Sequence, residues 1–195
     1  MTPDSILDNR LKEAKESVEL LGLNRSKPLN ILELGAGIGH LSYLLEKYNH
    51  NVTCCDVEGY AAHKKLKYKS AKTKVYAEAV ELLNIHKQHF YYEPNDNSSF
   101  DGLKKYDYVI WQNNSMWQNT EYCTKQVTVH FFNGLVNLLK PNGKLIIGYY
   151  GEQGKDSLFE QSECHSIMTP YLLNGTLWSN FGYYVWRLNS DDVIE

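Results

Sequence analysis

The sequence has few cysteines, and their spacing is not typical of a zinc site or of a disulfide framework. The four are Cys54, Cys55, Cys123 and Cys164. No two are spaced as C-x-x-C, the usual signature of zinc sites and redox motifs. We therefore expect reduced, mostly buried thiols in a cytoplasmic protein. His86 and His89 have a near-ligand spacing, but no carboxylate or cysteine pattern joins them, and we predict no metal site.

Long apolar runs and a strong excess of one charge are also missing. No stretch approaches the length of a membrane-spanning helix, and residues 1–10 lack the basic and apolar regions of a signal peptide. Lys and Arg number 20 against 23 Asp and Glu, for a formal net charge of −3. This balance gives no general affinity for nucleic acid or for an anionic membrane surface.

One dense run of positive charge, six lysines within residues 64–74, departs from that balance. One interpretation is a local patch for phosphate or RNA. The other is a solvated helix face, which we favour because the chain as a whole is acidic.

What is present is the alternation of an α/β domain. The 195 residues suffice for one compact domain, 43% of them hydrophobic. Helical spacing of apolar residues predicts helices at 4–21, 38–48, 60–85 and 124–139. The segment 60–85 is long for one crossover helix, which indicates two helices or an insertion. Short apolar runs predict strands at 29–34, 52–56, 89–92, 107–111, 144–150 and 183–188, with 176–179 as a hairpin partner of the last.

A glycine-rich loop follows the first predicted strand and opens a helix. Its sequence, ELGAGIG, places Glu33 before Gly35, Gly37 and Gly39. Glycines are needed there because the backbone turns sharply and a ligand lies against it. Asp56 ends the second predicted strand, 21 residues after Gly35, and can accept hydrogen bonds from both ribose hydroxyls of an adenosine group. Glu58 is the rival for that contact.

The loop distinguishes between adenosine cofactors. The dinucleotide fingerprint G-x-G-x-x-G requires glycine at position 40, where this chain has His40. Glu33 would repel a pyrophosphate but can bind an ammonium group directly or through water. S-adenosylmethionine carries an ammonium and a sulfonium and no phosphate, so we predict S-adenosylmethionine and exclude NAD.

Four segments in order resemble the successive motifs of class I S-adenosylmethionine-dependent methyltransferases: ILELGAGIGH, VTCCDVEG, KYDYVIWQN and LLKPNGKLIIG. They cover residues 29–150. The resemblance implies a Rossmann-like three-layer α/β sandwich with a mostly parallel seven-stranded sheet and an antiparallel last strand. The cofactor would lie across the carboxyl ends of the strands at 29–34, 52–56 and 107–111. The segment between the second and third strands is longer than is usual in the family.

The resemblance also implies roles for individual residues. Glu33, Gly35, Gly37 and Gly39 would hold the methionine end, and Asp56 the ribose. Val57 would lie against the adenine, and Glu93 or Asp96 would face its exocyclic amine. The single domain at 1–195 would comprise an N-terminal amphipathic helix (1–25), a cofactor-binding core (29–150), and a substrate-side segment with a terminal hairpin (151–195).

By the same resemblance, residues that face the methyl acceptor are expected after the strand at 107–111. The amides of Gln112 and Asn113 are candidates to hydrogen-bond there, and we assign Gln112 to the cofactor and Asn113 to the catalytic side. Trp111 is either a wall of the acceptor site or part of the core. His165, on the segment after the strand at 144–150, ranks first as a general base, ahead of His130, for which a structural role is favoured.

We predict a methyltransferase acting on an oxygen or nitrogen of a small molecule, with no membrane partner. Methylation of RNA or of a protein tail is the second interpretation, supported by the lysine run. The third is a non-catalytic cofactor-binding subunit, because its cofactor motifs would be the same.

Overall fold

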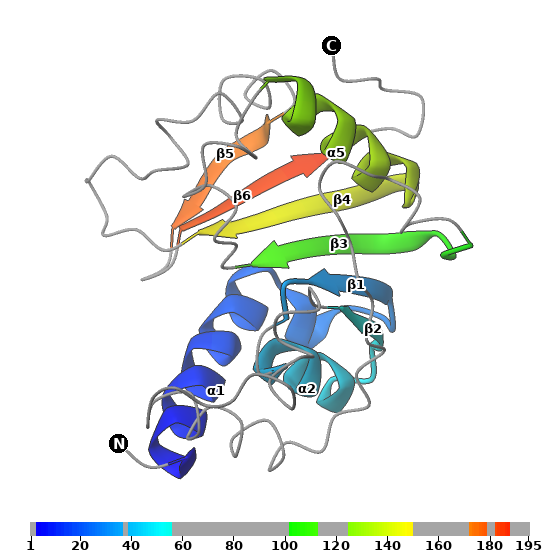
Figure 1. The fold of residues 1–195 in the computed structure, drawn as a ribbon. Helices are drawn as coiled ribbons and strands as arrows, with labels where there is room; N and C mark the ends of the chain where they lie inside the picture. The colour runs from blue at the N-terminus through cyan, green and yellow to red at the C-terminus, as the bar shows by residue number, and fades with distance from the viewer. Residues whose placement is uncertain are drawn as a thin grey trace, which may run out of the picture.

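The computed structural model describes residues 3–36, 39–55, 102–112, 125–149, 172–178 and 182–187. The helices in these ranges are α1 (Pro3–Leu20), the short 3-10 helix η1 (Leu23–Arg25), α2 (His40–Lys47) and α5 (Lys125–Asn137). The strands are β1 (Asn30–Leu34), β2 (Asn51–Cys55), β3 (Tyr106–Gln112), β4 (Leu139–Tyr149), β5 (Leu172–Trp178) and β6 (Gly182–Arg187). Figure 1 shows α1 and α2 beside β1 and β2, with α5 beside β4.

The described strands form one sheet in the order β2-β1-β3-β4-β6-β5. β2, β1, β3 and β4 run parallel, while β6 is antiparallel to both β4 and β5. Parallel neighbours need helical crossovers, which the alternating sequence pattern supplies. The α/β class with a parallel sheet is therefore confirmed. The strand predicted at 89–92 lies outside the described residues, so the count of seven stays a prediction.

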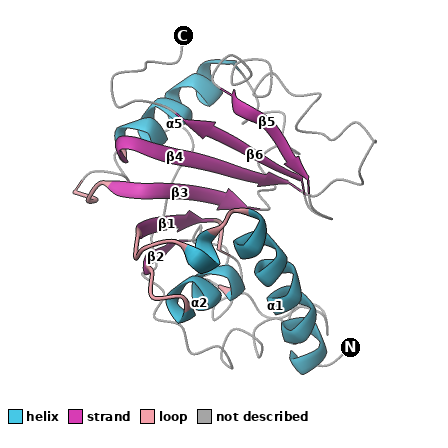
Figure 2. Cartoon of the chain, turned by 180° about the vertical axis from the view of Figure 1, so that it is seen from behind, coloured by secondary structure: helices cyan, strands magenta, loops and turns pink. Residues whose placement is uncertain are grey.

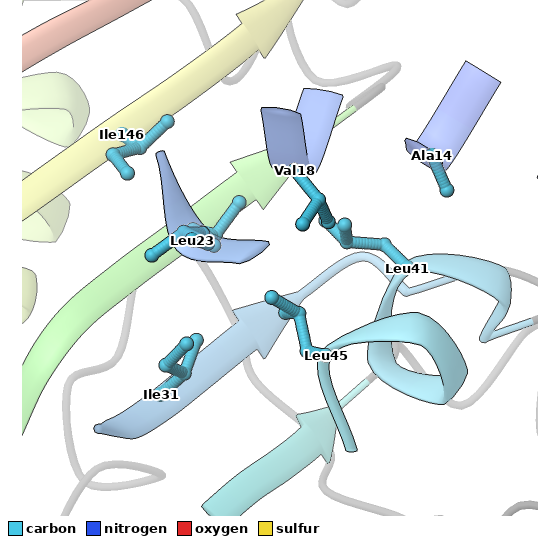
Figure 3. Packing of buried hydrophobic residues seen from close by; sticks show 8 residues of the cluster. Ala14, Val18, Leu23, Ile31, Leu41, Leu45 and Ile146 are labelled. Atoms are coloured by element: carbon cyan, nitrogen blue, oxygen red, sulfur yellow. The ribbon is translucent and has the colours of Figure 1, made fainter. Parts of the chain in front are cut away.

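Adjacent residues of β3 pack against helices on opposite faces of the sheet. Ile110 belongs to a buried cluster with residues of α1, η1, β1, α2 and β4, and Figure 3 shows seven of the eight members labelled, converging from these elements. The next residue, Trp111, packs edge-on against Phe132 of α5, with ring centroids 5.8 Å apart. Successive strand side chains point to opposite faces, so α1 and α2 form one layer and α5 another (Figure 2).

The helix ends follow the glycine and asparagine signals of the sequence. α1 ends before Gly22, which adopts a left-handed φ of 68°, and α2 is followed by Asn49 at φ 64°. Left-handed residues at these positions end helices by turning the last carbonyls toward new donors. The N–H of Gly22 donates to the Glu19 carbonyl, and that of Asn49 donates to the Glu46 carbonyl.

The junction of α5 and β4 differs from the sequence prediction. The sequence predicts a helix to residue 139 and a strand from 144, with Pro141-Asn142-Gly143 as the turn between them. The helix instead ends at Asn137, and β4 begins at Leu139, which pairs with Tyr106. The next pair is Tyr108 with Lys144. Residues 140–143 thus bulge from the ladder, which reconciles the turn signal with an early strand start.

An ion pair ties the amino ends of three strands together. Asp107 of β3 accepts hydrogen bonds from the Asn30 backbone N–H (2.7 Å) and from Lys140 Nζ (2.9 Å to each carboxylate oxygen). Lys140 lies in the bulge of β4, and Asn30 begins β1. The contact therefore sets the relative position of β1, β3 and β4 at the edge opposite their carboxyl ends.

Two sequence expectations concern groups that the described residues only partly include. Cys54 and Cys55 are buried thiols, as predicted, while Cys123 and Cys164 lie outside the described residues. Across the described ranges, no three histidine, cysteine or carboxylate side chains gather in a group able to hold a metal ion. None of the helices in the described part of the chain has the length and apolar character needed to cross a membrane.

Candidate cofactor-binding site

The carboxyl ends of the four parallel strands meet at one edge of the sheet. Leu34, the last residue of β1, is in register with Cys55 on one side and Trp111 on the other. Trp111 is in register with Ile147, and Gln112 with Gly148. Ligands of open α/β sheets bind outside this edge, where the connecting loops can separate.

The glycine loop begins at this edge, directly after β1. Gly35 adopts φ 69° and Gly39 φ 81°, the left-handed region in which a side chain is strained. Gly39 is also the N-cap residue of α2. The Ala36 N–H donates to the Cys55 carbonyl at 3.0 Å, and the Gly39 N–H donates to the Ala36 carbonyl at 2.8 Å. The loop is therefore a tight turn anchored to the end of β2.

This geometry fits the cofactor predicted from the sequence. Gly35 and Gly39 carry no side chain at the two left-handed positions of the turn, and the amino end of α2 is the positive end of its helix dipole. His40, which occupies the sixth position of the motif, is the first residue of α2 and is buried. Dinucleotide-binding loops need glycine at that position for close packing of helix on strand, and this loop has a buried histidine there instead.

Glu33 places a carboxylate beside the loop but within the protein. It is 1% exposed and accepts a hydrogen bond from the hydroxyl of Ser42, which is fully buried in α2. Buried carboxylates are stable only when hydrogen bonds or opposite charges compensate the lost hydration. The sequence pattern identified Glu33 but not Ser42; the only signal was a serine in the first turn of the helix that follows the loop.

The other predicted residues have different outcomes. Gln112 is the last residue of β3, at the same edge as the loop. Trp111 is fully buried against Phe132, so of the two interpretations for it the core is correct. His130 is exposed on α5. Residues that lie outside the described ranges are Gly37, Asp56, Val57, Glu93, Asp96, Asn113 and His165.

Comparison with known protein families gives one match, in which residues 18–166 correspond to the methyltransferase small domain. This match covers most of the chain. The chain belongs to the methyltransferase small domain family. The predictions of a methyltransferase and of S-adenosylmethionine as its methyl donor are thereby confirmed at the level of the family. A comparison with curated protein sequences finds no match.

Solved structures share the fold of this methyltransferase domain at low sequence identity. An O-methyltransferase family protein from Burkholderia thailandensis aligns over 97% of the chain with 11% identity and a TM-score of 0.59; the chain spans 60% of that protein's length. A protein from Pyrococcus horikoshii OT3 aligns over 90% of both chains with 17% identity and a TM-score of 0.56. A TehB-like SAM-dependent methyltransferase from Corynebacterium glutamicum aligns over 87% of this chain and 85% of its own, with 15% identity and a TM-score of 0.54. These likenesses show the fold.

Proposed function

We propose that this chain transfers the methyl group of S-adenosylmethionine to an oxygen or nitrogen atom of a small molecule. The observation that carries the proposal is the tight loop at Gly35–Gly39, with its two left-handed glycines beside the buried Glu33 at the carboxyl edge of the parallel sheet. The likeness to an O-methyltransferase family protein supports an oxygen acceptor. The net charge of −3 supports a small molecule over RNA.

The proposed cofactor contacts follow the order of the motifs. Glu33 and the glycines of the loop would hold the methionine end, and Asp56, which follows the last residue of β2, would accept from the ribose. Val57 and Glu93 would border the adenine, and Gln112 would approach the cofactor from the end of β3. This arrangement assumes a seven-stranded sheet, with residues 89–92 beside β2 and β6 as the antiparallel last strand.

The chemistry requires little from the protein beyond position and a dry environment. When bound, the cofactor supplies a methyl group made electrophilic by its sulfonium. In the proposal, Asn113 orients the acceptor by hydrogen bonds, and His165 takes the proton that the acceptor loses. We expect His165→Asn to lower kcat by roughly 10²- to 10⁴-fold, the usual contribution of a general base, while the affinity for the cofactor stays unchanged.

A methyl-transfer screen with labelled S-adenosylmethionine tests the proposal against small-molecule, peptide and RNA pools. Label incorporated only into the small-molecule pool is the expected result. The matched control is Gly37→Val, whose branched side chain would fill the loop and abolish transfer. Incorporation into RNA or peptide would overturn the proposed acceptor class. Cofactor binding without transfer to any pool would favour a non-catalytic subunit.

A further inference from the structure

The Glu33–Ser42 hydrogen bond joins the two segments that flank the glycine loop. Glu33 is the penultimate residue of β1, and Ser42 is the third residue of α2. Both residues are at most 1% exposed, and the Ser42 hydroxyl donates to Glu33 Oε2. Residues 35 and 39, with their left-handed backbones, lie between them in sequence. The bond therefore closes the base of the loop from the helix side.

This contact differs in kind from the others that hold the loop. The Ala36–Cys55 and Gly39–Ala36 hydrogen bonds join backbone atoms, so they persist whatever side chains are present. The Ser42–Glu33 bond depends on two side chains. A single substitution can remove it while the turn keeps its backbone contacts.

A glutamate side chain loses considerable rotamer freedom when a ligand fixes it, and that loss weakens binding. A buried donor that already holds the carboxylate removes much of this cost before the ligand arrives. An ionised carboxylate has about four lone-pair sites, so a carboxylate that accepts from Ser42 can also accept from an ammonium group. The amino end of α2 favours the negative charge at this place.

We propose that Ser42 is a positioning residue that holds the Glu33 carboxylate ready for the amino-acid end of the cofactor. The inference rests on the proposed role of Glu33. It predicts a selective effect. Loss of the Ser42 hydroxyl weakens the binding of ligands that carry the ammonium group and leaves the binding of ligands without it unchanged. A serine that merely stabilised the packing of α2 on β1 would affect both kinds of ligand alike.

Calorimetric titration with two ligands makes this distinction without relying on activity. S-adenosylhomocysteine retains the amino-acid end, and 5′-methylthioadenosine is the same nucleoside without it. We expect Ser42→Ala to weaken S-adenosylhomocysteine roughly tenfold, the scale of a lost hydrogen bond to a charged group. The same variant should bind 5′-methylthioadenosine as the wild type does.

The matched control is Ser17→Ala. Ser17 is also a fully buried serine in the same helical layer, but its hydroxyl donates to the Glu13 backbone carbonyl at 2.9 Å. We expect this variant to bind both ligands with unchanged affinity. Glu33→Gln should weaken S-adenosylhomocysteine roughly ten- to a hundredfold. Adding Ser42→Ala to Glu33→Gln should then have little further effect, because the hydroxyl acts through Glu33.

The outcomes separate the two levels of the proposal. If Ser42→Ala weakens the binding of both ligands equally, or changes the binding of neither, Ser42 does not position Glu33 and the inference is wrong. If Glu33→Gln binds S-adenosylhomocysteine as tightly as the wild type, the proposed role of Glu33 fails first. If Glu33→Gln weakens binding and Ser42→Ala does not, the role of Glu33 stands and only the inference about Ser42 fails.

Discussion

At the residue scale, backbone geometry fixes the glycines of the loop, and a side-chain contact joins Glu33 to Ser42. Gly35 and Gly39 adopt left-handed φ values because the tight turn after the strand requires them. Glycine is the residue type that favours such values, so the glycines in the sequence predict the turn. Ser42 could not be assigned to Glu33 from sequence. Their contact depends on how α2 packs on β1, which no local pattern encodes.

The ribose contact is the residue-scale assignment most open to a direct test. Cys55 ends β2 at the carboxyl edge of the sheet, and Asp56 follows it. We expect Asp56→Asn to weaken S-adenosylhomocysteine by roughly 1–3 kcal/mol, because asparagine cannot accept from both ribose hydroxyls with full charge. Titration of Glu58→Gln in parallel is the control. Weakening by Glu58→Gln alone would assign the contact to Glu58.

At the element scale, the periodicity of apolar residues located most helices and strands to within one or two residues. One exception is β5, which begins at Leu172 rather than at residue 176. The other is the start of β4, where Pro141-Asn142-Gly143 were correctly interpreted as a turn signal but lie within a bulged strand. The bulge could not be anticipated, because it arises from pairing with β3 and from the Lys140–Asp107 ion pair. Pairing over long sequence separations is not visible in a local window.

A substitution at Gly143 tests how tightly the bulge at residues 140–143 is packed. A Cβ at that position would lie 2.8 Å from the Lys140 carbonyl oxygen and 3.1 Å from Leu139 Cβ. We expect Gly143→Ala to lower the free energy of unfolding by about 1–3 kcal/mol, measured by urea denaturation. Asn142→Gly is the control, since φ at Asn142 is already 63°, and its effect should stay within about 1 kcal/mol. Wild-type stability of Gly143→Ala would mean that the bulge relaxes.

The Asp107–Lys140 contact predicts a pH dependence of stability. Burial raises the pKa of Asp107, but hydrogen bonds from Lys140 and the Asn30 N–H, with the lysine charge, bring it below its ordinary value of 3.8. A carboxyl whose pKa is lowered by folding contributes stability above the unfolded value, and that stability is lost as the pH falls through the folded value. We expect Asp107→Asn to cost about 1 kcal/mol at pH 7, because the pair is partly exposed and screened.

Urea denaturation at several pH values provides the measurement. The difference between Asp107→Asn and the wild type should shrink as the pH is lowered below about 4, where the wild-type carboxylate becomes protonated. The control is Glu19→Gln, which removes the exposed Lys15–Glu19 pair, with 4.0 Å between its charged atoms. A difference that stays constant down to about pH 3 would show that the charge of Asp107 does not contribute.

At the scale of the whole molecule, the class of fold and cofactor were predictable because several independent signals agreed. Alternating strands and helices indicated a parallel sheet, and the glycine loop predicted a ligand site at its carboxyl edge. The acceptor was not predictable, since it depends on side chains brought together from separate loops. Trp111 illustrates the difficulty: its position near the end of β3 was compatible with a substrate wall or with the core, and its complete burial in the structure decides for the core.

Cofactor binding should stabilise the entire domain, and this provides a test of cofactor identity. The proposed contacts come from the ends of β1, β2 and β3, so a bound ligand links central strands of the sheet. A ligand at about a hundred times its Kd stabilises the folded state by about 2.7 kcal/mol, which corresponds to a Tm increase of roughly 5–10 °C for a domain of this size.

We expect this increase in Tm with S-adenosylhomocysteine. NAD at the same concentration should give none, because Glu33 repels the pyrophosphate and His40 occupies the place of the third dinucleotide glycine. Thermal denaturation of Glu33→Gln with both ligands is the matched control. This variant should show a smaller Tm increase with S-adenosylhomocysteine than the wild type does. If NAD raises the Tm of the wild type more than S-adenosylhomocysteine does, the cofactor assignment is contradicted.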